Sequence, residues 1–153
     1  MFLTLSQEII TIDKLTILQE LMQDIANTTN SEVEPNSYVT ISDTTNSRIY
    51  SSGNINIIGK GCINTKVHSG GLLKIDGILR GGEVYGRLGV TVGEAGAISG
   101  TKTVIATATG NSVTIMRAHE GTVIRIGETV RKLLKEEKFI QAKLDDDGQI
   151  IFE

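Results

Sequence analysis

Cysteine, proline and aromatic residues are scarce in this chain of 153 residues, and tryptophan is absent. The single cysteine, Cys62, excludes an intramolecular disulfide and fits a reducing compartment. Aromatic residues make up only 4% of the chain, so Ile, Val, Leu and Ala must fill any core. That composition suits a thin, repetitive β structure better than a conventional globular core.

A surplus of positive charge and long apolar runs are absent as well. The net charge is −3 at pH 7, which leaves no basic excess to neutralise a phosphate backbone, so we expect no nucleic-acid partner. No stretch approaches the ~18 consecutive apolar residues of a membrane helix. The first residues also lack the basic and apolar regions of a signal peptide. We therefore expect a cytoplasmic protein without membrane insertion.

Residues 12–27 carry the pattern of an amphipathic helix, with Thr11 as its N-cap. Its apolar residues recur at spacings of three and four: Ile12, Leu15, Leu18, Leu21, Met22 and Ile25. Four of them also fit a heptad seam that could bind a partner helix: Leu15, Leu18, Met22 and Ile25. Packing on the rest of the domain would explain the same stripe. The polar stretch 27–37 holds the only proline and indicates a linker, which divides the chain into 1–37 and 38–153.

Glycine is the residue that the chain has in abundance, and 13 of its 17 glycines fall within residues 53–100. Between them lie three apolar doublets, Ile55/Ile57, Leu73/Ile75 and Val90/Val92, spaced 18 and then 17 residues apart. Four single apolar residues could line the other faces: Ile63, Val67, Val84 and Ile98. Coils of short strands with glycine corners, stacked to close a common core, would produce this pattern. An antiparallel meander is the alternative, but it need not keep so constant a period.

The remaining β segments flank this repeat. A strand is expected at 38–42 with a turn at 43–47, and four more strands at 103–109, 112–116, 122–126 and 129–134. Residues 139–152 predict a terminal hairpin whose turn is Asp145 to Gly148, and such a hairpin would protect an open sheet edge. The fold predicted is mainly β: a single right-handed β-helix (β-solenoid) of three to four coils, with one N-terminal amphipathic α-helix and a C-terminal hairpin cap.

Several strings of the β region are similar to a known family. They are Tyr50–Ile55, Gly59–Thr65, the Arg-Gly-Gly-Glu string that opens 80–84, Gly93–Gly96 and Thr122–Gly127. The sequences of these strings and their order along the chain resemble the C-terminal part of the flagellar assembly protein A family, over about residues 49–153. The resemblance implies a β-solenoid in a bacterial cytoplasmic protein and a role in flagellar assembly or polar organisation. It carries no catalytic motif, so we expect a non-catalytic scaffold that binds a protein partner or its own copies.

No pattern in the chain predicts a catalytic, cofactor or metal site. Cys62 and His68 lie six residues apart, but no further ligand or orienting side chain accompanies them, and a buried cysteine without a chemical role is expected. The glycines of 86–96 lack the helix that a phosphate-binding loop requires, and we interpret them as solenoid corners. The acidic turn 145–148 fails the calcium-loop spacing.

Arg80, Glu83 and Arg87 form the candidate interaction site on the solenoid, as a surface ion network around a glycine corner. Charges that merely solvate the corner are the simpler interpretation.

Two alternatives belong to other classes of protein. A left-handed β-helix acyltransferase places an aliphatic residue every six positions, as Val92, Ile98 and Val104 do, although the register breaks upstream. A bactofilin-like solenoid would instead polymerise end to end into filaments.

Overall fold

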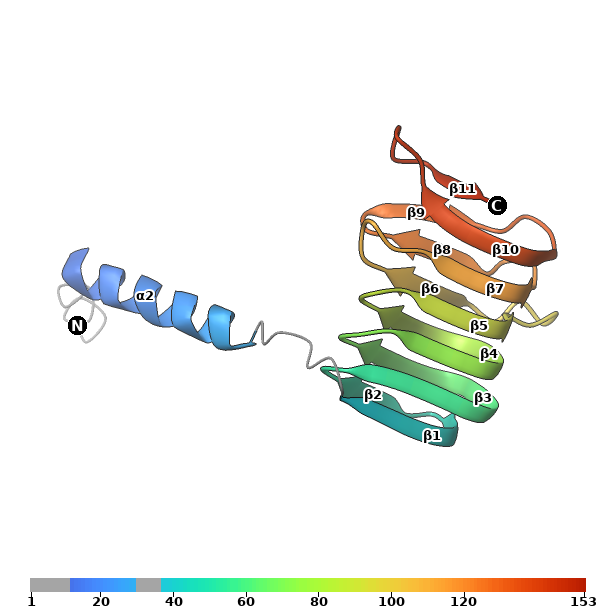
Figure 1. The fold of residues 1–153 in the computed structure, drawn as a ribbon, viewed down its shortest axis with the longest axis horizontal. Helices are drawn as coiled ribbons and strands as arrows, with labels where there is room; N and C mark the ends of the chain where they lie inside the picture. The colour runs from blue at the N-terminus through green and yellow to red at the C-terminus, as the bar shows by residue number, and fades with distance from the viewer. Residues whose placement is uncertain (1–11, 30–36) are drawn as a thin grey trace, which may run out of the picture. The chain divides into compact units, whose positions relative to one another are not determined.

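The computed structural model describes residues 12–29 and 37–153. The chain divides into two compact units, Met1–Glu32 and Val33–Glu153. The first contains helix α2 (Ile12–Thr29), and the second contains all the strands (Figure 1). The strands are β1 (Tyr38–Thr45), β2 (Arg48–Ser51), β3 (Asn54–Ser69), β4 (Leu73–Gly86), β5 (Val90–Ala95), β6 (Thr103–Thr107), β7 (Val113–Ala118), β8 (Val123–Ile126), β9 (Thr129–Lys132), β10 (Glu137–Leu144) and β11 (Ile150–Phe152).

Helix α2 confirms the expected helix and continues it by two residues, to Thr29. Good helix formers, including Leu, Gln and Met, fill its middle, which explains the helix locally. The proposed N-cap Thr11 and most of the expected linker, residues 30–36, lie outside the described residues.

The β unit is a solenoid of about five turns, more than the three to four coils expected from the sequence. The additional turns come from β1 and β2 before the glycine-rich stretch and from β6, β7 and β8 after it. The segment 43–45, expected as part of a turn, continues β1 because it pairs with residues 61–63 of β3. The right-handed winding stays a prediction.

Parallel pairing between successive coils rules out the antiparallel meander. One row of parallel strands runs from β1 through β3, β4 and β5 to β7. A second row runs from β2 through the later halves of β3 and β4 to β6 and β8. Figure 1 shows these rows as the two sides of one stack. The long strands β3 and β4 belong to both rows because they bend at register shifts near residues 58–60 and 76–77.

The apolar doublets stack in register, as the 17–18-residue spacing predicted. Two inward-facing columns run along the solenoid, Val39–Ile55–Leu73–Val90–Val113 and Ile41–Ile57–Ile75–Val92–Ile115. From the second coil onward, every member is at most 2% exposed. Burying a side chain of this size stabilises the fold by about 1.5–3 kcal/mol, so these columns contribute a large part of the stability of the core.

Two of the four single apolar residues do not face the core, which corrects the sequence prediction. Val67 and Val84 are buried and in register with each other, as expected. Ile63 is half exposed, because its neighbour Cys62 takes the inward position. Ile98 is 95% exposed, because it lies in an extra loop of residues 96–102 between β5 and β6.

The glycines are needed both at corners and at close backbone contacts. Gly61 has φ +118°, and a Cβ there would lie only 2.0 Å from the carbonyl oxygen of Ile78. Within 86–96, Gly89 and Gly96 have positive φ and form corners. Gly86 is the last residue of β4, and its carbonyl accepts a hydrogen bond from the N–H of Gly89 at 3.2 Å, so it opens the turn after β4. Gly93 lies in β5, directly over the bend at residues 76–77 of β4. At Gly93 a Cβ would meet the carbonyl oxygen of Asp76 at 2.4 Å.

The C-terminal end of the stack is closed by antiparallel strands. Two of them, β10 and β11, form the terminal hairpin that the sequence predicted. β9 folds back on β8, β10 folds back on β7, and β11 pairs with β10. In the connecting turn, one carboxylate oxygen of Asp145 accepts hydrogen bonds from the backbone N–H groups of Asp147 and Gln149, at 3.0 and 2.8 Å. This carboxylate therefore organises the turn.

Candidate functional site

The charged corner Arg80–Glu83 does not form the ion network considered from the sequence. Glu83 pairs instead with Arg125, at 3.3 Å between its Oε1 and Nη2, which joins β4 to β8 across β6. The side chains of Arg80 and Arg87 have no hydrogen-bond or ion-pair partner within the described ranges 12–29 and 37–153. The structure therefore does not bring these three residues together as one site.

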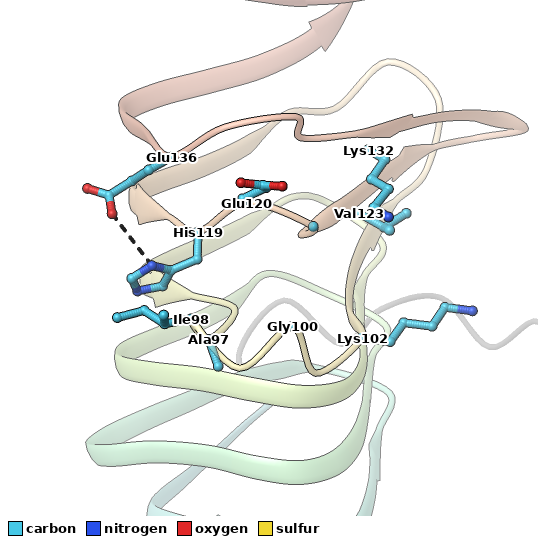
Figure 2. Close-up of a pocket in the computed structure, with 10 residues that line it drawn as sticks. Ala97, Ile98, Gly100, Lys102, His119, Glu120, Val123, Lys132 and Glu136 are labelled. Atoms are coloured by element: carbon cyan, nitrogen blue, oxygen red, sulfur yellow. Dashed lines mark ion pairs between the residues drawn. The ribbon is translucent and has the colours of Figure 1, made fainter.

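A cavity of about 690 Å³ lies beside the extra loop 96–102 (Figure 2). The loop forms one wall, and the segment around the turn after β7, together with Glu136, forms the other. Its lining residues are Ala97, Ile98, Gly100, Lys102, His119, Glu120, Gly121, Val123, Lys132 and Glu136.

His119 is the central ionisable group beside this cavity, and it is almost fully buried. Its Nε2 lies 2.9 Å from Oε1 of Glu94, and its Nδ1 lies 3.6 Å from Oε2 of Glu136. Figure 2 shows the second of these contacts as a dashed line. Arg117 completes the cluster through its Nε, 3.2 Å from Oε1 of Glu136. Sequence reasoning did not find this cluster, because Glu94 and His119 lie 25 residues apart and only the coil stacking brings them together.

The geometry of His119 favours a positioning role over catalysis. A histidine that activates a nucleophile needs one ring nitrogen against a hydroxyl or thiol. Both nitrogens of His119 face carboxylates instead, which fixes the ring against the base of the loop. A Cβ at Gly96 would lie 3.2 Å from the Cβ of His119, so the side chain of His119 packs against Gly96, the first residue of the loop.

Cys62 and His68 do not form a reactive pair. Cys62 points into the core and is fully buried, and this burial raises the pKa of its thiol to about 12. His68 lies on the outer surface, stacked between Tyr50 and Tyr85 with ring centroids 5.9 and 4.7 Å apart. Stacked pairs of this kind stabilise by about 0.5–1.5 kcal/mol, so the three rings strengthen the contact between the first coils.

No group of three or more His, Cys, Asp or Glu side chains in the described part of the chain could hold a metal ion. The residues that suggested an acyltransferase are not equivalent in space. Val92 faces the core, Ile98 lies in the loop, and Val104 is half-buried next to the inward-facing Ile105.

The two ends of the solenoid differ. At the C-terminal end, Val113 and Ile115 are covered by Ala142 and Ile140 of β10, and all four side chains are at most 5% exposed. At the N-terminal end, the inward-facing Val39 is 39% exposed and Ile41 is only partly buried. Within residues 12–29 and 37–153, no strand pairs with the outer edge of β1 or β2. Among the strands of residues 37–153, the core is therefore covered at the C-terminal end and lacks a covering strand at the N-terminal end.

Helix α2 carries an apolar stripe whose described side chains are exposed. Leu15, Leu18 and Met22 of the expected seam are each more than half exposed, and Leu21 beside them is exposed too. The fourth seam residue, Ile25, lies in the helix, but its side chain is outside the described residues.

None of the described helices is long and apolar enough to cross a membrane. Comparison with known proteins found no matching family model, curated protein or solved structure.

Proposed function

We propose that this chain is a non-catalytic scaffold module that acts by self-association, in the manner expected of a cytoplasmic protein resembling the C-terminal part of flagellar assembly protein A. The observation that carries the proposal is the exposed apolar stripe of helix α2. The stacked solenoid supplies a regular surface, and His119, the most buried ionisable side chain near a cavity, is held by two carboxylates instead of facing a substrate. As part of the same proposal, the scaffold would bind a protein partner that takes part in flagellar assembly or polar organisation.

The helix supports self-association because it gains little stability alone. Isolated helices shorter than about 12–15 residues are marginal in water, and longer ones still depend on packing of their apolar face. Helix α2 has 18 residues, and its Leu15, Leu18 and Met22 are exposed. A second copy of the helix would bury the same stripe at the heptad positions.

The test is a substitution of the stripe in the full chain. We expect Leu18→Gln with Met22→Gln to convert a dimer or higher oligomer into a smaller species in sedimentation-velocity experiments. The helical circular-dichroism signal should fall at the same time, because a helix without a partner frays. Gln19→Ala, on the exposed surface between these residues, is the matched control and should leave the mass unchanged.

Two results would contradict the proposal. One is a wild-type chain that stays monomeric at all concentrations, with helicity that does not depend on concentration. The other is a thermal shift with coenzyme A together with acetyl transfer, which would favour the acyltransferase instead.

A further inference from the structure

Strand β1 has an outer edge that is ready for pairing. Asn54 of β3 donates its N–H to the carbonyl of Ser37, at 3.0 Å. Successive residues of a strand turn their backbone groups to opposite edges, so Val39 and Ile41 face β3. Tyr38 and Thr40 therefore turn their N–H and C=O groups away from the solenoid. No strand of the described chain meets these groups.

This edge also lacks the features by which proteins usually block edge pairing. Lysine, proline and inward-facing charge are the common protections. β1 contains none of them, and its one charged residue, Asp43, is engaged by the N–H groups of Lys60 and Gly61. At the opposite end, β9 carries Arg131 and Lys132, and Arg131 donates to the carbonyl of Ile150.

We propose that β1 pairs with β1 of a second copy, antiparallel about a two-fold axis, so that two open ends close into one continuous core. A second copy fits because antiparallel pairing centred on Thr40 would place Thr40 opposite Thr40 and Val39 opposite Ile41, with no like charges opposite each other, and such pairs are favourable. Pairing identical ends gives an isologous, closed interface. At the C-terminal end the edge strands are β9 and β11, but they have only four and three residues, and β9 carries Arg131 and Lys132. Short, basic edge strands resist pairing, so we expect the assembly to stop at two copies.

This inference rests on the proposed self-association but uses different residues from helix α2, so the two can fail separately. Loss of the helix contact is detected by helicity that depends on concentration. Pairing of β1 is detected by the exchange of particular backbone amides with solvent.

Amide hydrogen exchange in the full chain, measured residue by residue by NMR at low and high protein concentration, is the direct test. The amides of Tyr38 and Thr40 should exchange rapidly in the dilute protein and slow at least about tenfold when it is concentrated. The amides of Val39 and Ile41 are bonded within the coil, so their protection should change much less. Equal protection of all four amides at every concentration would overturn the proposal.

Thr40→Pro provides the matching variant. Proline removes an N–H that faces outward, so pairing should weaken by about tenfold or more in Kd while the ladder to β3 loses no hydrogen bond. Val39→Lys is the second variant, because a lysine at this partly exposed position can reach water only while the end is open. Thr91→Lys adds the same charge to an exposed position in the middle of the solenoid and should leave pairing intact.

A folded Val39→Lys variant whose Tyr38 and Thr40 amides keep their concentration dependence would show that another segment covers the edge, and would overturn the inference. In a folded Thr40→Pro variant, which has no amide at residue 40, an unchanged concentration dependence of the Tyr38 amide would overturn it in the same way. If helix substitutions abolish concentration-dependent helicity while these amides keep their concentration dependence, the two interfaces are independent and the β1 inference stands.

Discussion

At the scale of single residues, both histidines and several charged or aromatic side chains link neighbouring coils. His119 joins Glu94 of one coil to Glu136 beyond the last, and Glu83 reaches Arg125. Tyr50, His68 and Tyr85 stack across three coils. Each contact links residues that the coil period brings together, so these residues are better explained as ties between neighbouring turns than as parts of an active centre.

Cys62 gives a prediction about alkaline pH. Its thiol has a pKa of about 12 in the folded protein against 9.0 for an unburied thiol, because burial disfavours the thiolate. The neutral thiol therefore contributes stability that is fully present below pH 9 and is lost as pH rises from 9 towards 12. Urea unfolding of the wild type and of Cys62→Ala should show the wild type losing more stability across this range.

Thiol labelling is a separate control that tests the burial of Cys62. A maleimide reagent at pH 8 should leave Cys62 unlabelled in the folded chain and label it after unfolding in urea. Rapid labelling of the folded chain would mean that the thiol is accessible, against the full burial that the structure gives it.

At the scale of elements, the inward-facing doublets were the part of the fold that the sequence predicted best. A fixed spacing of Ile55, Leu73 and Val90 can arise only if each coil repeats the one before it, so the pattern determines register as well as strand positions. Ile63 and Ile98 were assigned wrongly because a single apolar residue does not show which way its Cβ points. That direction depends on the neighbouring corner, where Asn64 has φ +47°.

The cluster around His119 could not have been predicted from the same spacing. Val90 and Val113 are 23 residues apart but directly paired, because the loop 96–102 lengthens this coil. The longer period hides the alignment of Glu94 with Arg117 from any search at 17–18 residues. Only the parallel register shows that these two residues are neighbours.

Strand β10 is the element that seals the C-terminal end, and it gives a prediction about stability. Ile140 is 5% exposed and covers Ile115. We expect Ile140→Ala to lower the free energy of unfolding by about 2–5 kcal/mol, since it removes buried methyl groups and leaves a cavity. Gln141→Ala, at the exposed neighbouring position, should change it by no more than about 0.5 kcal/mol. Chemical denaturation measures both, and equal effects would mean that β10 does not cover the core.

At the scale of the whole molecule, stability depends on how many neighbours a coil has. In a stacked repeat, each unit contacts only the units directly before and after it. Ile75 lies between Ile57 and Val92, whereas Val39 has a paired neighbour on one side only among the strands that the structure describes. The N-terminal coil is therefore the weakest part of the stack and the one that gains most from an added partner.

This difference predicts unequal effects of the same truncation. Ile75→Ala should cost about 2–5 kcal/mol, and Val39→Ala no more than about 1 kcal/mol in dilute protein, because its site is already partly open. In concentrated protein the cost of Val39→Ala should rise if the ends pair. Thermal unfolding at two protein concentrations measures both quantities, and equal costs in dilute protein would contradict the open end.

The extra loop between β5 and β6 shows how such a protein can change. Residues 96–102 lengthen one coil, yet the residues on either side of the insertion stay in register with β4, Ala95 with Leu79 and Thr103 with Gly82. New sequence can therefore enter the solenoid at a corner without altering the columns of the core. Closing a longer loop costs only about 0.6 kcal/mol for each doubling of its length. This corner is therefore a place where the chain can acquire a new recognition element while keeping its architecture. The same applies to an epitope inserted in the laboratory beside the exposed Ile98.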